Sequence, residues 1–272
     1  TERFRIERGG RTLLTASVQK STPPTVAIPP AVAAAPDVDT LPARTALTAV
    51  LSLGGKLELE IRGKSLLVGP GERLPEPPFQ VRDVILDRVQ VLNAAAVAPL
   101  AALPAVTGKL SLVDSNASNA ILGTLAGYPA FQTLETVDLS GSGVTDDGLV
   151  HIARFAALTG LKIERIKTTE RGLAHIAQAK KLERLHLGGS GITLSGLKLV
   201  EKLPLTGFSL SECPKIADET MKWIGDRSNL TYLRLERVPF TDASLKEVVR
   251  LGQLRTLAIP AENLTAPIEA ML

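Results

Sequence analysis

The chain has 272 residues, of which 44% are hydrophobic and only 3% aromatic, so a buried core must consist mainly of Leu, Val, Ile and Ala. The 31 basic and 28 acidic residues leave a net charge of +3 without a long basic run, which argues against a dedicated nucleic-acid or membrane-surface binder. The single cysteine excludes an internal disulfide framework and the usual cysteine-based zinc sites. No stretch approaches the roughly 18 apolar residues of a membrane span, so we expect no insertion of this chain into a bilayer.

Three short units are expected before the main domain. Residues 1–20 fit a hairpin, because two short apolar stretches flank a Gly-Gly turn. Residues 21–44 are rich in proline and alanine, which predicts an extended linker. Residues 45–79 combine a short apolar helix at 45–53 with a second hairpin, and this unit would cap the open end of the following domain.

From residue 80 to residue 272 one pattern returns about every 24 residues and predicts about eight structural repeats. Positions separated by this period carry Val144, Thr168, Ile192, Ile216 and Phe240. Each regular unit opens with an alternating apolar stretch, which predicts a strand whose leucines point inward. A Thr or Asp follows and would cap a short helix by accepting bonds from its open N–H groups.

These units predict an α/β fold, a curved leucine-rich repeat solenoid with a small N-terminal α+β cap. Each strand would pair with its copy in the next repeat, so that a parallel sheet lines the concave side. The helices are bulkier than the strands and are therefore expected on the convex side.

Two turns resemble the cysteine-containing type of leucine-rich repeat, which has a V-T-D-x-G-L signature. The stretch from Val144 to Leu149 carries this signature, and the stretch from Leu210 to Asp218 is similar to the L-x-x-C-x-x-I-x-D form. Such repeats occur in F-box leucine-rich repeat proteins and in many bacterial repeat proteins. Residues 46–86, with their V-L-S-L-G-G and L-P-E-P-P-F motifs, are similar to the segment before the repeats of bacterial receptor-like Ser/Thr kinases.

The resemblance implies non-enzymatic protein–protein recognition on the concave face, as the sensing or scaffold part of a bacterial signalling protein. The alternative is a substrate-receptor subunit of a ubiquitin-ligase-like complex, although residues 1–79 do not resemble an F-box. We expect a monomer that binds a protein partner and no nucleic acid. Because the chain opens on Thr1 rather than Met, we expect a fragment or a processed form, and the compartment stays open between extracytoplasmic and cytoplasmic.

The outward positions of the predicted strands provide the candidate partner-binding residues. They are Lys162, Glu164, Arg184, His186, Tyr232, Arg234 and Glu236. Since neighbouring strands lie about 4.8 Å apart, the four basic residues would form one mixed patch, with the tyrosine as an aromatic anchor. The alternative is a solvated charged face in which the glutamate at 164 pairs with a nearby Arg or Lys.

No catalytic residue, cofactor or metal site is expected. The chain lacks a phosphate-binding loop and a nucleophile elbow, and its carboxylates follow the capping positions rather than converging. His151 and His175 lie one repeat apart but have no third ligand in register, so helix-surface positions explain them better than a metal does. Cys213 is expected to pack at a turn, and Trp223 to lie half exposed with an edge contact to the next helix. Pro260 would interrupt the last strand.

Overall fold

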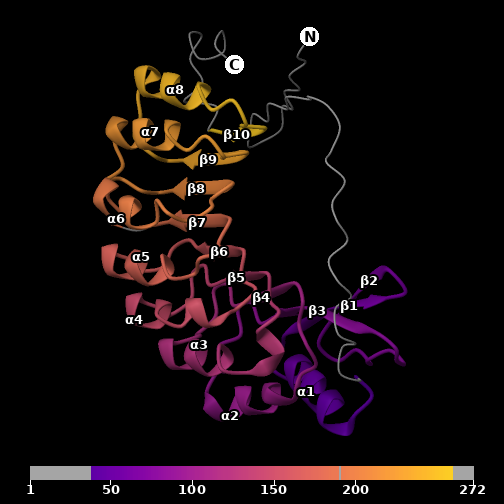
Figure 1. The fold of residues 1–272 in the computed structure, drawn as a ribbon. Coiled ribbons are helices and arrows are strands. Elements are labelled where there is room, and N and C mark those ends of the chain that lie inside the picture. Colours follow the sequence, from indigo (N-terminus) through magenta and orange to yellow (C-terminus); the bar gives the residue numbers. More distant parts are fainter. Residues whose placement is uncertain (1–37, 190, 260–272) are drawn as a thin grey trace.

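The computed structural model describes residues 38–189 and 191–259, which form a curved stack of strand–helix units (Figure 1). The strands are β1 (Lys56–Ile61), β2 (Lys64–Val68), β3 (Gln80–Ile85), β4 (Lys109–Ser111), β5 (Thr136–Asp138), β6 (Gly160–Ile163), β7 (Arg184–Gly188), β8 (Gly207–Ser211), β9 (Tyr232–Glu236) and β10 (Thr256–Ala258). The helices are α1 (Leu41–Ser52), α2 (Ala94–Val97), α3 (Asn119–Leu125), α4 (Asp146–Leu149), α5 (Glu170–Ile176), α6 (Leu194–Leu199), α7 (Asp218–Gly225) and α8 (Asp242–Val249). Short 3-10 helices are η1 (Ala98–Ala102), η2 (Pro129–Phe131) and η3 (Ile152–Arg154).

One sheet of ten strands runs through the described part of the chain, in the order β10-β9-β8-β7-β6-β5-β4-β3-β1-β2. Strands β3 to β10 pair in parallel with their neighbours, whereas β1 is antiparallel to both β2 and β3. The strands line the inner side of the arc and the helices cover its outer side (Figure 1). The predicted α/β leucine-rich repeat solenoid is therefore confirmed.

The helix of the N-terminal cap begins earlier than predicted. Helix α1 starts at Leu41, four residues before the expected start at 45. The assignment of residues 41–44 to an extended linker was therefore wrong. The Thr40 hydroxyl accepts a bond from the Ala43 N–H at 3.3 Å, and Pro42 stands in the first helical turn, where its missing N–H costs nothing. The predicted hairpin at 1–20, most of the linker, and Pro260 lie outside the described residues.

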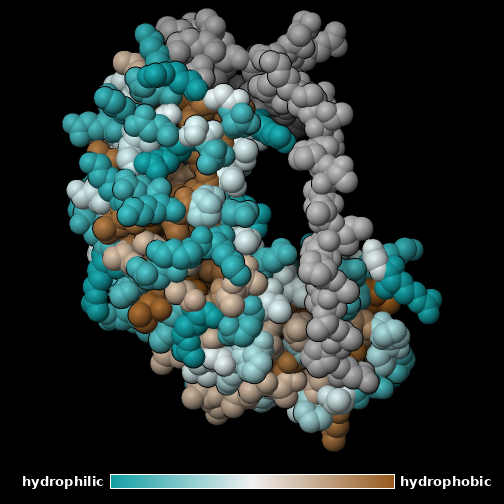
Figure 2. Space-filling view, viewed as in Figure 1, coloured by the Kyte–Doolittle hydropathy of each residue, from teal (hydrophilic) through white to brown (hydrophobic). Residues whose placement is uncertain are grey.

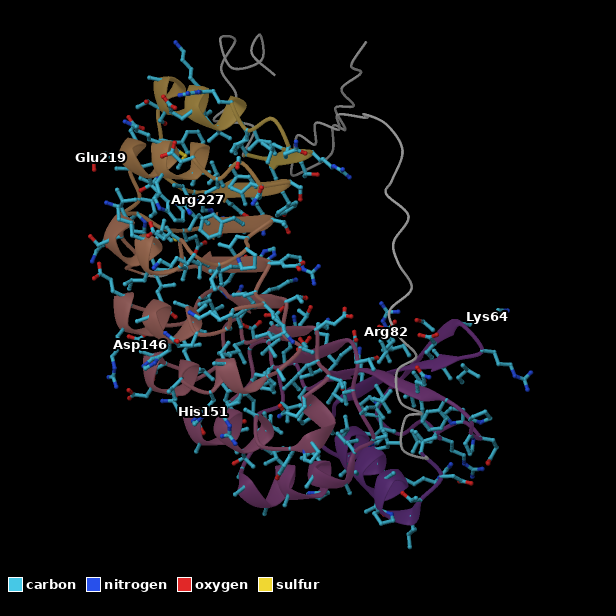
Figure 3. All side chains as sticks on the ribbon, viewed as in Figure 1. Lys64, Arg82, Asp146, His151, Glu219 and Arg227 are labelled. Carbon is cyan, nitrogen blue, oxygen red and sulfur yellow. The ribbon has the colours of Figure 1, made fainter. Side chains whose placement is uncertain are left out.

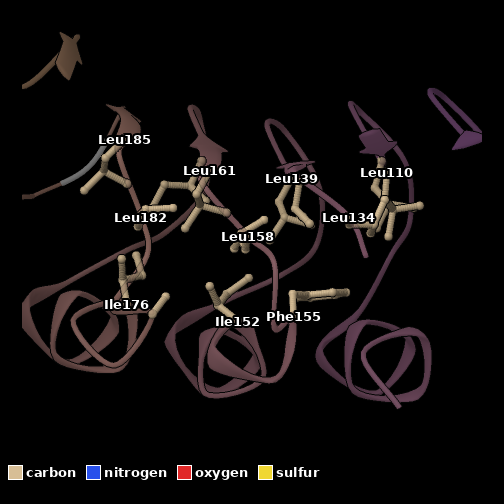
Figure 4. Packing of buried hydrophobic residues seen from close by; sticks show 14 of the residues in the cluster. Leu110, Leu134, Leu139, Ile152, Phe155, Leu158, Leu161, Ile176, Leu182 and Leu185 are labelled. Carbon is tan, nitrogen blue, oxygen red and sulfur yellow. The ribbon is translucent and has the colours of Figure 1, made fainter. Parts of the chain in front are cut away.

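The predicted strand register is confirmed in the core. Leu161, Leu185, Phe208 and Leu233 pair in sequence across β6 to β9, and each is at most 1% exposed. Figure 4 shows Leu161 and Leu185 on the side of the strands that faces the helices, where isoleucines of the helical side meet them. A strand of period two that buries this row must point its other side chains into the concave opening.

Hydrogen bonds also connect successive repeats on the helical side. Asp146, the first residue of α4, accepts hydrogen bonds from Thr169, the N-cap of α5. The donors are the Thr169 backbone N–H, at 2.9 Å, and the Thr169 hydroxyl. Asp218 likewise accepts from Thr241, the N-cap of α8, at 3.0 Å from the backbone and 2.9 Å from the hydroxyl. We call such a contact a cap pair, because the first residue of one helix binds the N-cap of the next. A cap pair fixes the spacing of the two helices as well as the start of the second one.

The cap pairs vary along the stack. Glu170 accepts from the Thr193 hydroxyl at 2.6 Å, and this threonine caps α6 as predicted. Thr145 was predicted to cap α4, but its hydroxyl accepts from the Asn119 amide at 2.9 Å and caps no N–H of its own helix. At the junction of α6 and α7 both members are replaced, by Leu194 and Ala217, and α7 has no side-chain cap.

Candidate functional site

The outward side chains of β5 to β9 form rows across the concave face, and we name two of them. The first row consists of Thr136, Gly160, Arg184, Gly207 and Tyr232. The central row consists of Asp138, Lys162, His186, Ser209 and Arg234. The structure therefore brings five of the seven predicted binding residues into two adjacent rows, and the two predicted glutamates flank the central row.

Arg184 stands between two glycines in the first row. A Cβ at Gly207 would lie 3.2 Å from its Cγ, and a Cβ at Gly160 would lie 3.4 Å from its Nε. The arginine side chain therefore occupies space that larger neighbours would need. Its guanidinium donates to the Thr159 hydroxyl at 3.1 Å, and the residue is exposed.

Arg234 is engaged by two carboxylates. Its guanidinium lies 3.7 Å from the Glu164 carboxylate and also pairs with Glu236 on its own strand. The contact with Glu164 crosses β7 and β8, where Gly188 and Ser209 are small enough to be bridged. For Glu164 and Arg234, a charged face with cross-strand ion pairs is therefore a better description than a purely basic patch.

Lys162 is the other compensated cation of the central row. Its Nζ lies 3.9 Å from the Asp138 carboxylate on the neighbouring strand. The Asp138 side chain is 13% exposed and the Lys162 side chain 44%, so the aspartate of this pair is better shielded from solvent than the lysine. The sequence did not single out Asp138 as part of the site, although the alternation of β5 placed it outward.

His186 lies at the middle of the candidate site. Its ring packs against Tyr232 with 6.1 Å between the ring centroids and a 40° tilt. Burial, together with the charges of Lys162, Arg234 and Arg184, lowers the pKa of His186 to about 4, and only Asp138 acts in the opposite direction. The imidazole is therefore neutral at pH 7 and offers one donor and one acceptor.

Ser209 lies in the central row but is not one of the predicted binding residues. It is completely buried, and its hydroxyl has no hydrogen-bond partner among the described residues. Its neighbours in the row are the larger residues His186 and Arg234. The occurrence of Gly160, Gly207 and Ser209 at outward positions of short strands was the signal that could have shown where long side chains would lie.

The inner edge of the arc is mainly hydrophilic. Figure 2 shows teal and white residues along the side of the stack that faces the opening. In Figure 3 many side chains project from the strands toward this opening, and Arg82 of β3 faces it from the N-terminal end. The concave face thus offers charged, hydrogen-bonding and aromatic groups rather than an apolar cleft.

The two histidines of the helical side take no part in this face. His151 lies on the outer side of the stack (Figure 3), and burial beside Arg154 lowers its pKa. Within 38–189 and 191–259, no group of three or more His, Cys, Asp or Glu is arranged to hold a metal ion. Over the same residues, no helix has the length and apolar character needed to cross a membrane.

Trp223 is buried, and its predicted half exposure was wrong. It is 8% exposed, meets Phe208 edge-on with 6.1 Å between the ring centroids, and carries the Arg227 guanidinium 4.3 Å from its ring. Trp223 is offset by one residue from the core positions of α7, which is why the sequence predicted exposure, but Phe208 and Arg227 pack against its ring.

Cys213 is buried at its turn, where its thiol donates to the Ser211 carbonyl at 3.4 Å.

Two cavities lie away from the rows. One of about 460 Å³ lies between α1 and the loop that contains Glu72, Arg73 and Glu76. A smaller one of about 140 Å³ lies between the ends of α6 and α7, beside Trp223 and Arg227. Neither brings a nucleophile, base and charge-stabilising group together in the way that catalysis requires.

Comparison with known proteins supports the fold and leaves the site open. A family model described as Leucine Rich repeat matches residues 132–153. A search of curated proteins finds no match. Residues 134–139, which open the first regular repeat, lie inside the matched segment.

Three solved structures are similar over part of their length. An internalin (InlF) of Listeria monocytogenes is 15% identical, with 63% of this chain and 58% of that chain covered and a TM-score of 0.36. The yeast Rad7 and Elc1 complex matches at 19% identity, 60% and 44% coverage and a TM-score of 0.49. The Arabidopsis receptor kinase HAESA, solved with the peptide hormone IDA and the co-receptor SERK1, matches at 20% identity, 64% and 29% coverage and a TM-score of 0.37. The chain spans less than two thirds of the length of each of these proteins.

Proposed function

We propose that this leucine-rich repeat protein is a non-enzymatic recognition module, which binds an extended segment of a protein partner on its concave sheet. The observation that carries the proposal is the arrangement around Arg184. An exposed guanidinium stands between two glycines, next to the tilted ring pair of His186 and Tyr232. Tyrosine and arginine are the residue types that contribute most to interface energetics.

The difference between the helical side and the concave side of the stack supports the proposal. On the helical side, Asp146 and Asp218 bind the N-caps of the following helices and thus stabilise the repeats. On the concave side, Arg184 is exposed and donates to the Thr159 hydroxyl, and the Tyr232 ring packs against His186. A solenoid whose repeats contact only their neighbours presents such a surface over several strands.

The wider setting is also a proposal. The resemblance of the cap and repeats favours the sensing or scaffold part of a bacterial signalling protein, acting as a monomer. The second candidate, a substrate receptor of a ubiquitin-ligase-like complex, rests on the cysteine-containing repeat around Cys213 alone. The coding sequence upstream of Thr1 separates the two, because the first requires a kinase domain with a membrane span and the second an F-box.

Selective blocking of the concave face tests the recognition function. Short random peptides displayed on phage are selected on the full chain, and the enriched peptides are then bound to two labelled variants. Ser211→Cys places a thiol on the concave end of β8, and Lys198→Cys places one on the exposed side of α6. Since Cys213 is buried, a bulky maleimide reacts at the introduced thiol.

The proposal requires that the label at position 211 abolishes peptide binding while the label at position 198 leaves it intact. Equal binding to both labelled variants would mean that the ligands bind elsewhere, and the proposed function would then be wrong. A thermal melt of each labelled chain confirms that the fold has survived.

A further inference from the structure

We infer that the partner's anchoring group is an acidic side chain, an Asp or Glu in an extended segment, and that Arg184 binds its carboxylate. The inference rests on the proposed function, since it names the chemistry that the concave face selects. It is carried by the distribution of charge among the outward residues of β6 to β9.

Arg184 differs from the other arginines that lie in or directly after strands β6 to β9. Among the described residues, no carboxylate lies within ion-pair distance of its guanidinium, which donates to the Thr159 hydroxyl. The other three arginines of these strands and turns have acidic partners: Arg165 with Asp114 at 2.7 Å, Arg234 with Glu164 at 3.7 Å, and Arg237 with Glu212. Between β6 and β9, Arg184 therefore offers a planar donor fork to a ligand carboxylate.

His186 adds no charge beside Arg184. Three cations, Lys162, Arg234 and Arg184 itself, act against protonation of His186, and Asp138 alone favours it. The neutral imidazole can hydrogen-bond the backbone of a bound segment. The guanidinium of Arg184 itself attracts an anion and repels a basic segment.

The glycines on both sides of Arg184 make room for its own side chain. Gly160 and Gly207 are buried, with Arg184 atoms 3.4 and 3.2 Å from where their Cβ atoms would lie, and Tyr232 closes the row on β9. An extended segment that crosses the sheet can place one acidic side chain on the exposed guanidinium.

Charge reversal tests the inference. The same random peptide library is selected on the wild-type chain, on Arg184→Glu and on Lys198→Glu, a charge reversal on the outer side of α6. We expect wild-type and Lys198→Glu selections to share an Asp or Glu at one position. These peptides should bind Arg184→Glu at least about tenfold more weakly, a loss of about 1.4 kcal/mol, and that variant should enrich Lys or Arg at the same position.

The outcomes separate the two proposals. Peptides that the label at position 211 blocks, but that carry no shared acid or bind Arg184→Glu equally well, overturn the carboxylate anchor and leave concave recognition standing. Peptides that this label does not block, or no enrichment on a folded chain, overturn both. Arg184→Gln, which removes charge without reversing it, replaces Arg184→Glu if the latter melts at a clearly lower temperature.

Discussion

Replacing Ala217 by threonine is expected to stabilise the solenoid, because it adds a missing helix cap at the junction of α6 and α7. Ala217 is the N-cap of α7 and has φ −133° and ψ −179°. Thr169, which caps α5 through its side chain, has φ −119° and ψ −174°. The backbone at position 217 is therefore already arranged for a capping threonine, and the exposed site has room for its side chain.

The size of the effect follows from the bonds that a threonine forms elsewhere in the stack. A capping Thr in place of Ala contributes about 1 kcal/mol to the free energy of unfolding, within a range of about 0.5 to 2 kcal/mol. Thr241 makes further bonds to Asp218, but at the α6–α7 junction Leu194 offers no acceptor. Adding Leu194→Asp should restore this cap pair, with a coupling of about 1 kcal/mol in a double-mutant cycle.

Urea unfolding followed by circular dichroism measures the effect as a shift of the midpoint at constant slope. Thr241→Ala is the matched control and should lower the midpoint by a comparable amount, since it removes the cap of α8 and its bonds to Asp218. If Ala217→Thr leaves the midpoint unchanged while Thr241→Ala lowers it, the capping argument fails at this junction.

Three further predictions follow from the concave strands. Leu185→Ala should cost about 2 to 5 kcal/mol in urea unfolding, because the side chain is fully buried, whereas Lys198→Ala should cost less than about 0.5 kcal/mol. Since the folded pKa of His186 is about 4 and the unfolded value 6.5, the unfolded state binds the proton first, and stability should fall by about 3 kcal/mol from pH 6.5 to pH 4. His186→Gln should remove this part of the pH dependence, and an unchanged slope would contradict the assignment. Ser209→Ala, which deletes an unpaired hydroxyl, should be neutral or stabilising, whereas Ser111→Ala, equally buried but bonded to an aspartate, should cost about 1 to 3 kcal/mol; the same sign for both would refute the argument.

The core was predictable from the sequence because periodicity determines it. The 24-residue period places Leu161 and Leu185 at equivalent positions, and identical positions in successive repeats must pair when the strands are parallel. Phe208 joins this row although its unit runs one residue early, because β8 pairs with β7 at a step of 23 residues and with β9 at a step of 25, and the register is recovered only after β8. Local irregularity in the loop therefore did not disturb the prediction for the strand.

The features that the sequence did not reveal depend on tertiary packing. Pro42 indicated a linker, but a proline in the first turn is compatible with a helix whose apolar residues pack on the core, as α1 does. Trp223 was expected to be half exposed because it is offset by one residue from the core positions of its helix, whereas packing against Phe208 buries it. The sequence suggested a pairing of Glu164 with a nearby Arg or Lys, but strand spacing alone did not identify Arg234, which lies across two intervening strands.

Small residues on the concave face determine which charges are available to a partner. Curvature brings outward side chains of neighbouring strands together, so two long side chains cannot stand side by side in one row without contact. Glu164 and Arg234 neutralise each other because Gly188 and Ser209 lie between them, with the hydroxyl of Ser209 left buried and unpaired. The glycines beside Arg184 instead separate it from other long side chains in its row, and among the described residues no carboxylate lies within ion-pair distance of it. The same principle of spacing thus produces an ion pair along the central row and an uncompensated cation in the first row, which is why binding is expected to depend on the first row.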